Sequence, residues 1–216
     1  MDDRRLDLDL EWWEPWTPAE VAERLRGADV RWYVLGGWAL DLFLGRRTRE
    51  HEDIEVGVPR DQFPAIQAAL DDLELVVVGD GHAWPLTDES LRAHRQTWAR
   101  EPGGPWRLDI IREHWDGDDW LYRRDDRIRR PAASTLAETS DAIPFLQPEI
   151  VLLFKAKAPR AKDDADLAAV LPHLDAERRR WLVDALLLVH PGHPWIELVA
   201  DFPAPAGHRD RGSERR

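Results

Sequence analysis

The segment His51-Glu52-Asp53-Ile54-Glu55 places four ionisable side chains in five positions, directly before an apolar run. Side chains alternate along a strand, so we expect Asp53 and Glu55 on one face and Ile54 in the core. Two carboxylates about 7 Å apart along a strand repel each other unless a cation lies between them. The spacing therefore indicates a divalent metal site. The alternative is a solvated strand end bridged by a nearby arginine: Arg47, Arg49 or Arg60.

A third carboxylate, Asp109, stands alone among apolar residues in the predicted strand 105–113. A buried aspartate needs a cation or hydrogen-bond donors. If this strand lies beside the first, three carboxylates meet on one sheet face, which is the donor set of a two-metal nucleotidyl transfer site. Two ions there would neutralise phosphate oxygens and help to ionise an attacking hydroxyl. The alternative is a core aspartate satisfied by backbone N–H groups or by an arginine.

The pair Gly36-Gly37 precedes a predicted helix, 16 residues before Asp53. A glycine turn at a helix N-terminus lets backbone N–H groups approach phosphate oxygens closely. The segment 45–49 adds arginine side chains, including Arg49, that can bind phosphate. We therefore expect a triphosphate near the metal ligands.

The apolar pattern predicts the elements that must bring these residues together. Predicted strands cover residues 30–35, 54–58, 75–78, 105–113 and 120–124, with a weakly apolar stretch at 96–99. Predicted helices cover residues 17–27, 38–45, 63–73, 149–158, 163–171 and 176–189. The turns Asp80-Gly81 and 116–119 suit hairpins. Trp115 and Trp120 flank the second turn and form either a stacking rim for a substrate or a plain exposed hairpin.

The amino-acid composition limits which catalytic groups, metals and substrates are possible. The chain has no cysteine, which excludes thiolate catalysis and cysteine zinc sites and favours a hard, oxygen-preferring metal. Its formal charge of −12 disfavours stable nucleic-acid binding and suits a cationic small acceptor. No apolar run approaches the roughly 20 residues of a membrane helix, and the acidic N-terminus lacks the layout of a secretory signal. We expect a cytoplasmic protein without membrane spans.

The stretches 35–41 and 45–55 resemble the signature of the minimal nucleotidyltransferases of the polymerase β superfamily. They are most similar to the aminoglycoside and lincosamide adenylyltransferase-like branch, whose pattern is Gly-Gly-Trp-Ala, then Gly-Arg-x-Thr-Arg-x-His-x-Asp-h-Asp. The resemblance implies an α+β fold: a nucleotidyltransferase-like mixed β-sheet flanked by helices over residues 17–147, then a small C-terminal helical subdomain over 148–200. The polar, Gly/Pro-rich segment 203–216 is expected to be a disordered tail.

The same resemblance implies roles for particular residues. Asp53 and Glu55 would hold Mg²⁺, with two ions expected, and Asp109 would be the third ligand or the general base. Gly36 and Gly37 would lie under the triphosphate of ATP or another nucleoside triphosphate.

Arg49 and Lys155 would meet the nucleotide, with a solvated surface position as the alternative for the lysine. Glu55 departs from the branch, which usually has Asp there. The implied reaction moves a nucleoside monophosphate, AMP from ATP, to a hydroxyl of a small molecule such as an aminoglycoside or lincosamide. Two alternatives stay open: a toxin-type nucleotidyltransferase acting on protein or tRNA, and a non-catalytic nucleotide-binding domain.

Overall fold

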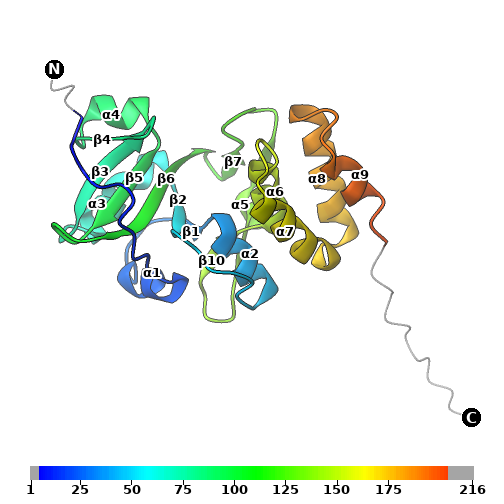
Figure 1. Ribbon diagram of the computed structural model, residues 1–216, viewed down its shortest axis with the longest axis horizontal. Coiled ribbons are helices and arrows are strands. Elements are labelled where there is room, and N and C mark those ends of the chain that lie inside the picture. Colours follow the sequence, from blue (N-terminus) through cyan, green and yellow to red (C-terminus); the bar gives the residue numbers. More distant parts are fainter. Residues whose placement is uncertain (1–4, 204–216) are drawn as a thin grey trace, which may run out of the picture. The chain divides into compact units, whose positions relative to one another are not determined.

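The computed structural model describes residues 5–203, so the predicted tail lies outside the described residues except for Pro203. The chain divides into two compact units, residues 1–151 and 152–216 (Figure 1). Within the described part, none of the helices combines the length and the apolar character that a bilayer-spanning helix needs.

The first unit is built on a mixed sheet with strand order β4-β3-β5-β6-β2-β1-β10-β9. Two neighbouring pairs are parallel, β2 with β6 and β1 with β10, and the other pairs are antiparallel. The short strands β7 and β8 extend the hairpin from the end of β6. The strands are β1 (Tyr33–Val34), β2 (Glu55–Pro59), β3 (Glu74–Gly79), β4 (His82–Trp84), β5 (Gln96–Arg100), β6 (Trp106–Asp116), β7 (Asp119–Leu121), β8 (Arg129–Pro131), β9 (Leu136–Glu138) and β10 (Pro144–Leu146).

Helices cover the sheet of this unit, and α1 and α3 supply most of the apolar cover. The helices are α1 (Pro18–Arg24), α2 (Gly36–Leu44), η1 (Arg60–Gln62), α3 (Phe63–Ala69), α4 (Asp88–Ala93) and α5 (Ala132–Thr135). Val21 of α1 and Ile66 of α3 pack with Val56 of β2 and Ile110 of β6 in one buried cluster. The alternation in the two strands therefore sends the even-numbered residues to the core and leaves the odd-numbered carboxylates on the opposite face.

Most predicted elements of this unit are present, with shifted ends. The predicted strand 105–113 is β6, which continues to Asp116 and turns where expected into β7. The Asp80-Gly81 turn joins β3 to β4. The predicted strand 30–35 contains only the two-residue β1, and the sequence pattern missed β10, its parallel neighbour.

The second unit is helical. The helix α6 (Pro148–Lys155) crosses the division between the units, and α7 (Ala161–Val170), η2 (Leu171–His173), α8 (Ala176–Val189) and α9 (Trp195–Ala200) follow. The bounds of α8 match the prediction, and Asp175 caps its N-terminus by accepting from the Arg178 backbone N–H. Within this unit Trp195 Nε1 donates to Asp164 Oδ1 at 2.8 Å, which ties α9 to α7.

Candidate active site

The two carboxylate-bearing strands lie next to each other. Parallel pairing of β2 with β6 puts Glu55 directly opposite Asp109, and the Asp109 backbone N–H donates to Ile54 O at 2.9 Å. Paired residues on neighbouring strands point to the same face, about 4.8 Å apart in the backbone. The condition set by the sequence, that the two acidic strands be neighbours, is therefore met.

Asp109 is a buried carboxylate with one satisfied oxygen. Its residue exposure is 2%, and its Oδ2 accepts from Gln96 Nε2 at 2.7 Å, whereas Oδ1 has no hydrogen-bond partner among the described residues. Burial raises the pKa of Asp109 well above its ordinary value, and the charges of Glu55 and Asp53 raise it further, against the lowering effects of Gln96 and of Trp98, its neighbour on β5. A cation beside Oδ1 would offset both the free-energy cost of burying the Asp109 charge and its repulsion by Glu55 and Asp53.

Asp53, two residues before the start of β2, is exposed, while Glu55 is half-buried. The influence of both charges on Asp109 shows that the three carboxylates share one electrostatic environment. In residues 5–203 no group of three or more His, Cys, Asp or Glu side chains has an arrangement that could hold a metal ion. The donor set, three carboxylates with an unsatisfied buried oxygen, nevertheless fits a hard divalent cation in its chemistry. Metal binding stays a prediction.

The first glycine of the pair, Gly36, makes room for Glu55. Gly36 has φ +61°, and a Cβ added there would overlap the Glu55 carboxylate. The Leu35 backbone N–H donates to Glu55 O at 2.8 Å, which fixes the turn against β2. The Glu55 carboxylate thus lies against the N-terminus of α2, where the helix dipole favours negative charge.

The second glycine, Gly37, makes room for a different group. A Cβ there would overlap the Arg49 guanidinium and the His51 ring. Arg49 Nη1 lies 3.1 Å from His51 Nδ1, and His51 Nε2 lies 2.6 Å from Asp41 Oδ2. Because an arginine can only donate, Nδ1 must accept, so the ring proton is on Nε2 and is donated to Asp41. This arrangement requires a neutral imidazole.

The surroundings keep His51 neutral. Burial lowers its pKa and so does the charge of Arg49, while the hydrogen bond to Asp41 acts in the opposite direction. Trp38 covers the ring with a centroid distance of 4.4 Å. The imidazole therefore connects the carboxylate of α2 to the guanidinium of Arg49.

Asp41 is the anchor of this segment, and the sequence did not predict its role. Gly45 ends α2 in the left-handed conformation, φ +65°, and the chain then reverses. Asp41 Oδ1 accepts from the Thr48 backbone N–H at 3.1 Å and from Thr48 Oγ1 at 2.5 Å. The available signal was a single carboxylate in the otherwise apolar segment 38–44.

Lys155, the other residue predicted to meet the nucleotide, belongs to the second unit. Its Nζ lies 2.7 Å from Asp163 Oδ1 and 2.9 Å from Asp166 Oδ2, and its side chain is 10% exposed. Burial alone would raise the pKa of Asp163, but hydrogen bonds from Arg160 and Lys155 lower it overall. Lys155 therefore holds α6 to α7 here, and its contact with a nucleotide stays a prediction.

The mixed sheet thus carries carboxylates on adjacent parallel strands, and a glycine turn begins a helix against one of them. Residues 19–94 match the model of the family described as aminoglycoside-2''-adenylyltransferase. That range contains the glycine pair, Asp41, Arg49, His51, Asp53 and Glu55, and ends before Asp109.

Two solved structures have a similar fold. The solution structure of the antibiotic-resistance factor ANT(2'')-Ia is similar over 78% of this chain and 88% of its own, with TM-score 0.51 and 17% identity. A crystal structure of ANT(2'')-Ia with adenylyl-2''-tobramycin is similar over 76% of this chain and 93% of its own, with TM-score 0.50 and 19% identity. No curated protein sequence matches the chain. These findings confirm the predicted fold and the resemblance to the adenylyltransferase branch, and they indicate a nucleotidyltransferase.

Proposed function

We propose that the protein is a Mg²⁺-dependent nucleotidyltransferase that moves AMP from ATP to a hydroxyl of a small molecule, such as an aminoglycoside or a lincosamide. The observation that carries this proposal is the pairing of Glu55 with Asp109 on adjacent parallel strands, with one buried Asp109 oxygen unsatisfied. The matching family description and the tobramycin adduct in a similar structure support an aminoglycoside-like acceptor. ATP as the donor also favours a cytoplasmic site of action.

The acidic face would bind the metal ions. Asp53 and Glu55 would hold them from the start of β2, and Asp109 would complete the ligand set or accept the proton of the acceptor hydroxyl. When bound, Mg²⁺ supplies neutralisation of the phosphate oxygens and of the leaving pyrophosphate. The glutamate side chain of Glu55 is longer than the aspartate usual in the branch, and its carboxylate lies next to Gly36 in the first turn of α2.

The basic side of the glycine turn would bind the phosphates. Arg49 is held by His51 against Gly37, so its guanidinium is oriented before the nucleotide arrives. A fixed fork of donors suits a phosphate group, and the loss of side-chain entropy on binding is reduced. His51 and Asp41 are positioning residues in this account.

Pyrophosphate release tests the proposal directly. The full chain is incubated with ATP, Mg²⁺ and a panel of aminoglycosides and lincosamides, and pyrophosphate and the adenylylated product are measured. We expect product with at least one acceptor, and its loss in Asp53→Asn. The matched control is Asp71→Asn, which removes an exposed carboxylate after α3 and leaves the acidic face intact. Absence of pyrophosphate release together with absence of Mg²⁺-dependent ATP binding would contradict the proposal.

A further inference from the structure

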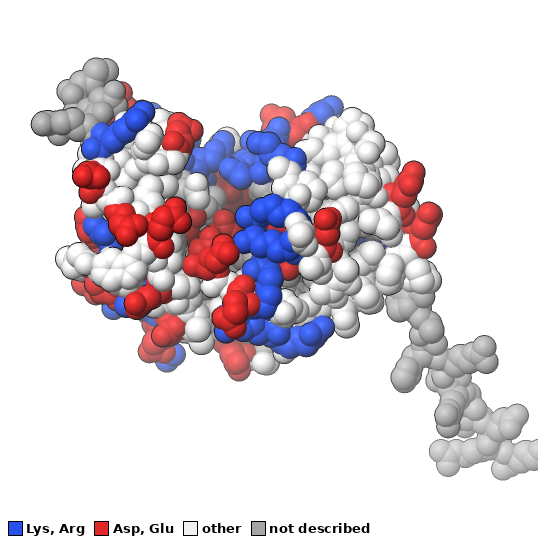
Figure 2. Space-filling model, in the orientation of Figure 1, with Lys and Arg blue, Asp and Glu red and all other residues white. Residues whose placement is uncertain are grey.

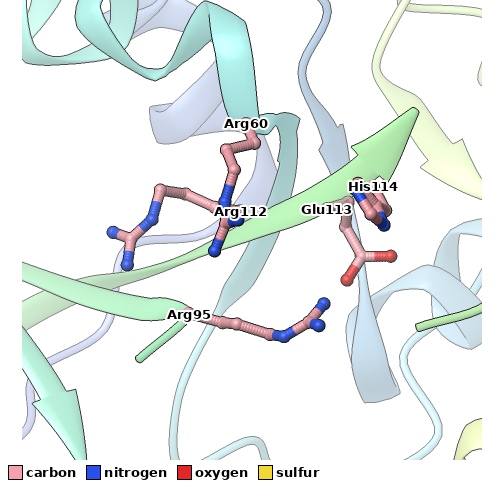
Figure 3. Close-up of a pocket in the computed structure, with 5 residues that line it drawn as sticks. All are labelled: Arg60, Arg95, Arg112, Glu113 and His114. Atoms are coloured by element: carbon pink, nitrogen blue, oxygen red, sulfur yellow. The ribbon is translucent and has the colours of Figure 1, made fainter. Parts of the chain in front are cut away.

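A small pocket at the other end of the β2–β6 pair gathers positive charge. Arg60, Arg95, Arg112, Glu113 and His114 line it (Figure 3). Arg60 and Arg112 lie together on one side, and the Arg95 side chain points toward the Glu113 carboxylate (Figure 3). Because Glu113 follows Asp109 by four residues along β6, the pocket is about 13 Å from the acidic face.

Arg112 is a buried cation without a counterion. Its residue exposure is 2%, and its guanidinium donates to Thr97 Oγ1 and, at 2.6 Å, to His94 O, which are neutral acceptors. Its Nε has no hydrogen-bond partner in the described part of the chain. Burial lowers the pKa of Arg112 to about 10, and the charge of Arg60 contributes to this shift. A buried unpaired charge is costly, so the position calls for a compensating anion.

The missing counterion distinguishes these arginines from others on the same sheet. Over residues 5–203, neither Arg60, Arg95 nor Arg112 lies within ion-pair distance of a carboxylate. Other arginines of the first unit are paired: Arg31 with Asp118, Arg100 with Glu74, Arg107 with Glu101, Arg129 with Asp116 and Arg130 with Glu149. All three arginines line one pocket, where Arg95 faces the Glu113 carboxylate without an ion pair, in a chain whose formal charge is −12.

Glu113 does not neutralise the pocket. It is 2% exposed, and its Oε2 accepts from Trp120 Nε1 at 2.9 Å. Burial raises the pKa of Glu113 against the lowering effects of Trp120 and of nearby arginines. Trp120 is itself fully buried, so for this residue both alternatives, a stacking rim for a substrate and a plain exposed hairpin, were wrong. The carboxylate is thus held by the indole and leaves a surplus of positive charge.

We propose that this pocket binds a small oxyanion, a phosphate, sulfate or carboxylate group, at a site separate from the nucleotide site at the glycine turn. Guanidinium groups bind such anions through paired, charge-assisted hydrogen bonds. Lys and Arg side chains gather in patches on the face in Figure 2, and at the pocket itself three arginines stand against one carboxylate, so the positive charge is local in a chain of negative net charge. The site does not depend on the proposed transfer reaction.

The test is a calorimetric titration of the full chain with inorganic phosphate, at constant ionic strength set by sodium chloride. We expect saturable binding at one site, weakened about tenfold or more by Arg60→Gln and by Arg95→Gln, since each removes a charge-assisted bond. Arg26→Gln is the matched control, because it removes an exposed arginine of the C-terminal turn after α1 and the same unit of charge. Arg112 is left intact because its replacement could unfold the core.

Three results would overturn the inference. The first is no saturable phosphate binding, and the second is a phosphate affinity of the Arg60→Gln and Arg95→Gln variants equal to that of wild type. The third is displacement of phosphate by ATP with a parallel loss of ATP affinity in these variants. The last result would assign the pocket to the nucleotide. Asp53→Asn separates this proposal from the proposed function, because it should abolish transfer and leave phosphate affinity unchanged.

Discussion

The two neighbouring glycines of the site contact side chains of opposite charge. Gly36 lies against the carboxylate of Glu55, whose neighbour on β6 is Asp109. Gly37 lies against Arg49 and His51, and His51 is hydrogen-bonded both to Arg49 and to Asp41. Hydrogen bonds among Arg49, His51 and Asp41 fix the positions of these side chains. The first group, at Gly36, keeps like charges close together: burial raises the pKa of Asp109, and the charges of Glu55 and Asp53 raise it further. A hydrogen-bonded network positions side chains, whereas a buried carboxylate oxygen without a donor, such as Asp109 Oδ1, is a candidate to bind a cation.

The largest expected effect comes from removing the unsatisfied charge. Asp109→Asn should lower turnover on the order of 10³-fold, because it removes a metal ligand. In the presence of a chelator it should stabilise the fold by about 1 kcal/mol near pH 7. The sign follows from the raised pKa of Asp109: the wild-type chain is favoured when this carboxyl is protonated and loses stability as the pH rises.

Urea unfolding with chelator at acidic and neutral pH measures this effect. An Asp109→Asn variant that is less stable than wild type at neutral pH would show that the carboxylate is structural. Asp71→Asn serves as the control for a lost surface charge.

The next effect separates the two glycines. Gly36→Ala should destabilise the fold by about 1–3 kcal/mol and lower turnover about 10²-fold, because the added Cβ displaces Glu55. Gly45→Ala is a matched control: its φ is also positive, +65°, but nothing lies within 4 Å of the added Cβ. Gly45→Ala should lower the free energy of unfolding by the backbone cost of about 1–2 kcal/mol and leave turnover unchanged. Equal turnover in the two variants would mean that the position of Glu55 is unimportant.

A smaller effect is expected on the satisfied side. His51→Phe keeps a ring against Trp38 and loses the hydrogen bonds to Arg49 and Asp41. The KM for ATP should rise about tenfold with a smaller change in kcat, because Arg49 is no longer oriented. His82→Phe, on the edge strand β4, is the control. A fall in kcat with unchanged KM would instead make His51 part of the reacting centre.

The smallest effect is a pH dependence. The pKa of His51 is lowered in the folded chain, so its contribution to stability is complete above about pH 6.5 and is lost as the pH falls toward the folded value. Relative to His51→Phe, wild type should lose up to about 1 kcal/mol between pH 6.5 and 5.5. Thermal or urea unfolding of both chains over this range isolates the histidine. Parallel profiles would contradict a neutral, buried His51.

For the acidic side, alternation predicts that Asp53 and Glu55 share one face of their strand, and it brings Asp109 beside them only if the two strands are neighbours. The register of β2 with β6 meets that condition, and the role of the carboxylates as metal ligands stays a prediction. The pairing of Asp41 with His51 depends on the chain reversal at Gly45, which no strand or helix period encodes.

Short and dispersed features were also beyond the pattern. The strand β10 has three residues and pairs with the two-residue β1, so neither length gives a strong periodic signal. The pocket at Arg112 is lined by residues of β6, by Arg60 directly after β2 and by Arg95 directly before β5, which are distant in sequence. Such sites emerge only when the register of the strands is known.

Calorimetric titration of Mg²⁺ with a non-hydrolysable ATP analogue tests the central claim most directly, because it reports metal and nucleotide binding without an acceptor. We expect Mg²⁺-dependent binding of the analogue to wild type and at least about tenfold weaker binding to Asp109→Asn. Equal affinity in the two chains, or binding that is indifferent to Mg²⁺, would contradict a metal site on the acidic face.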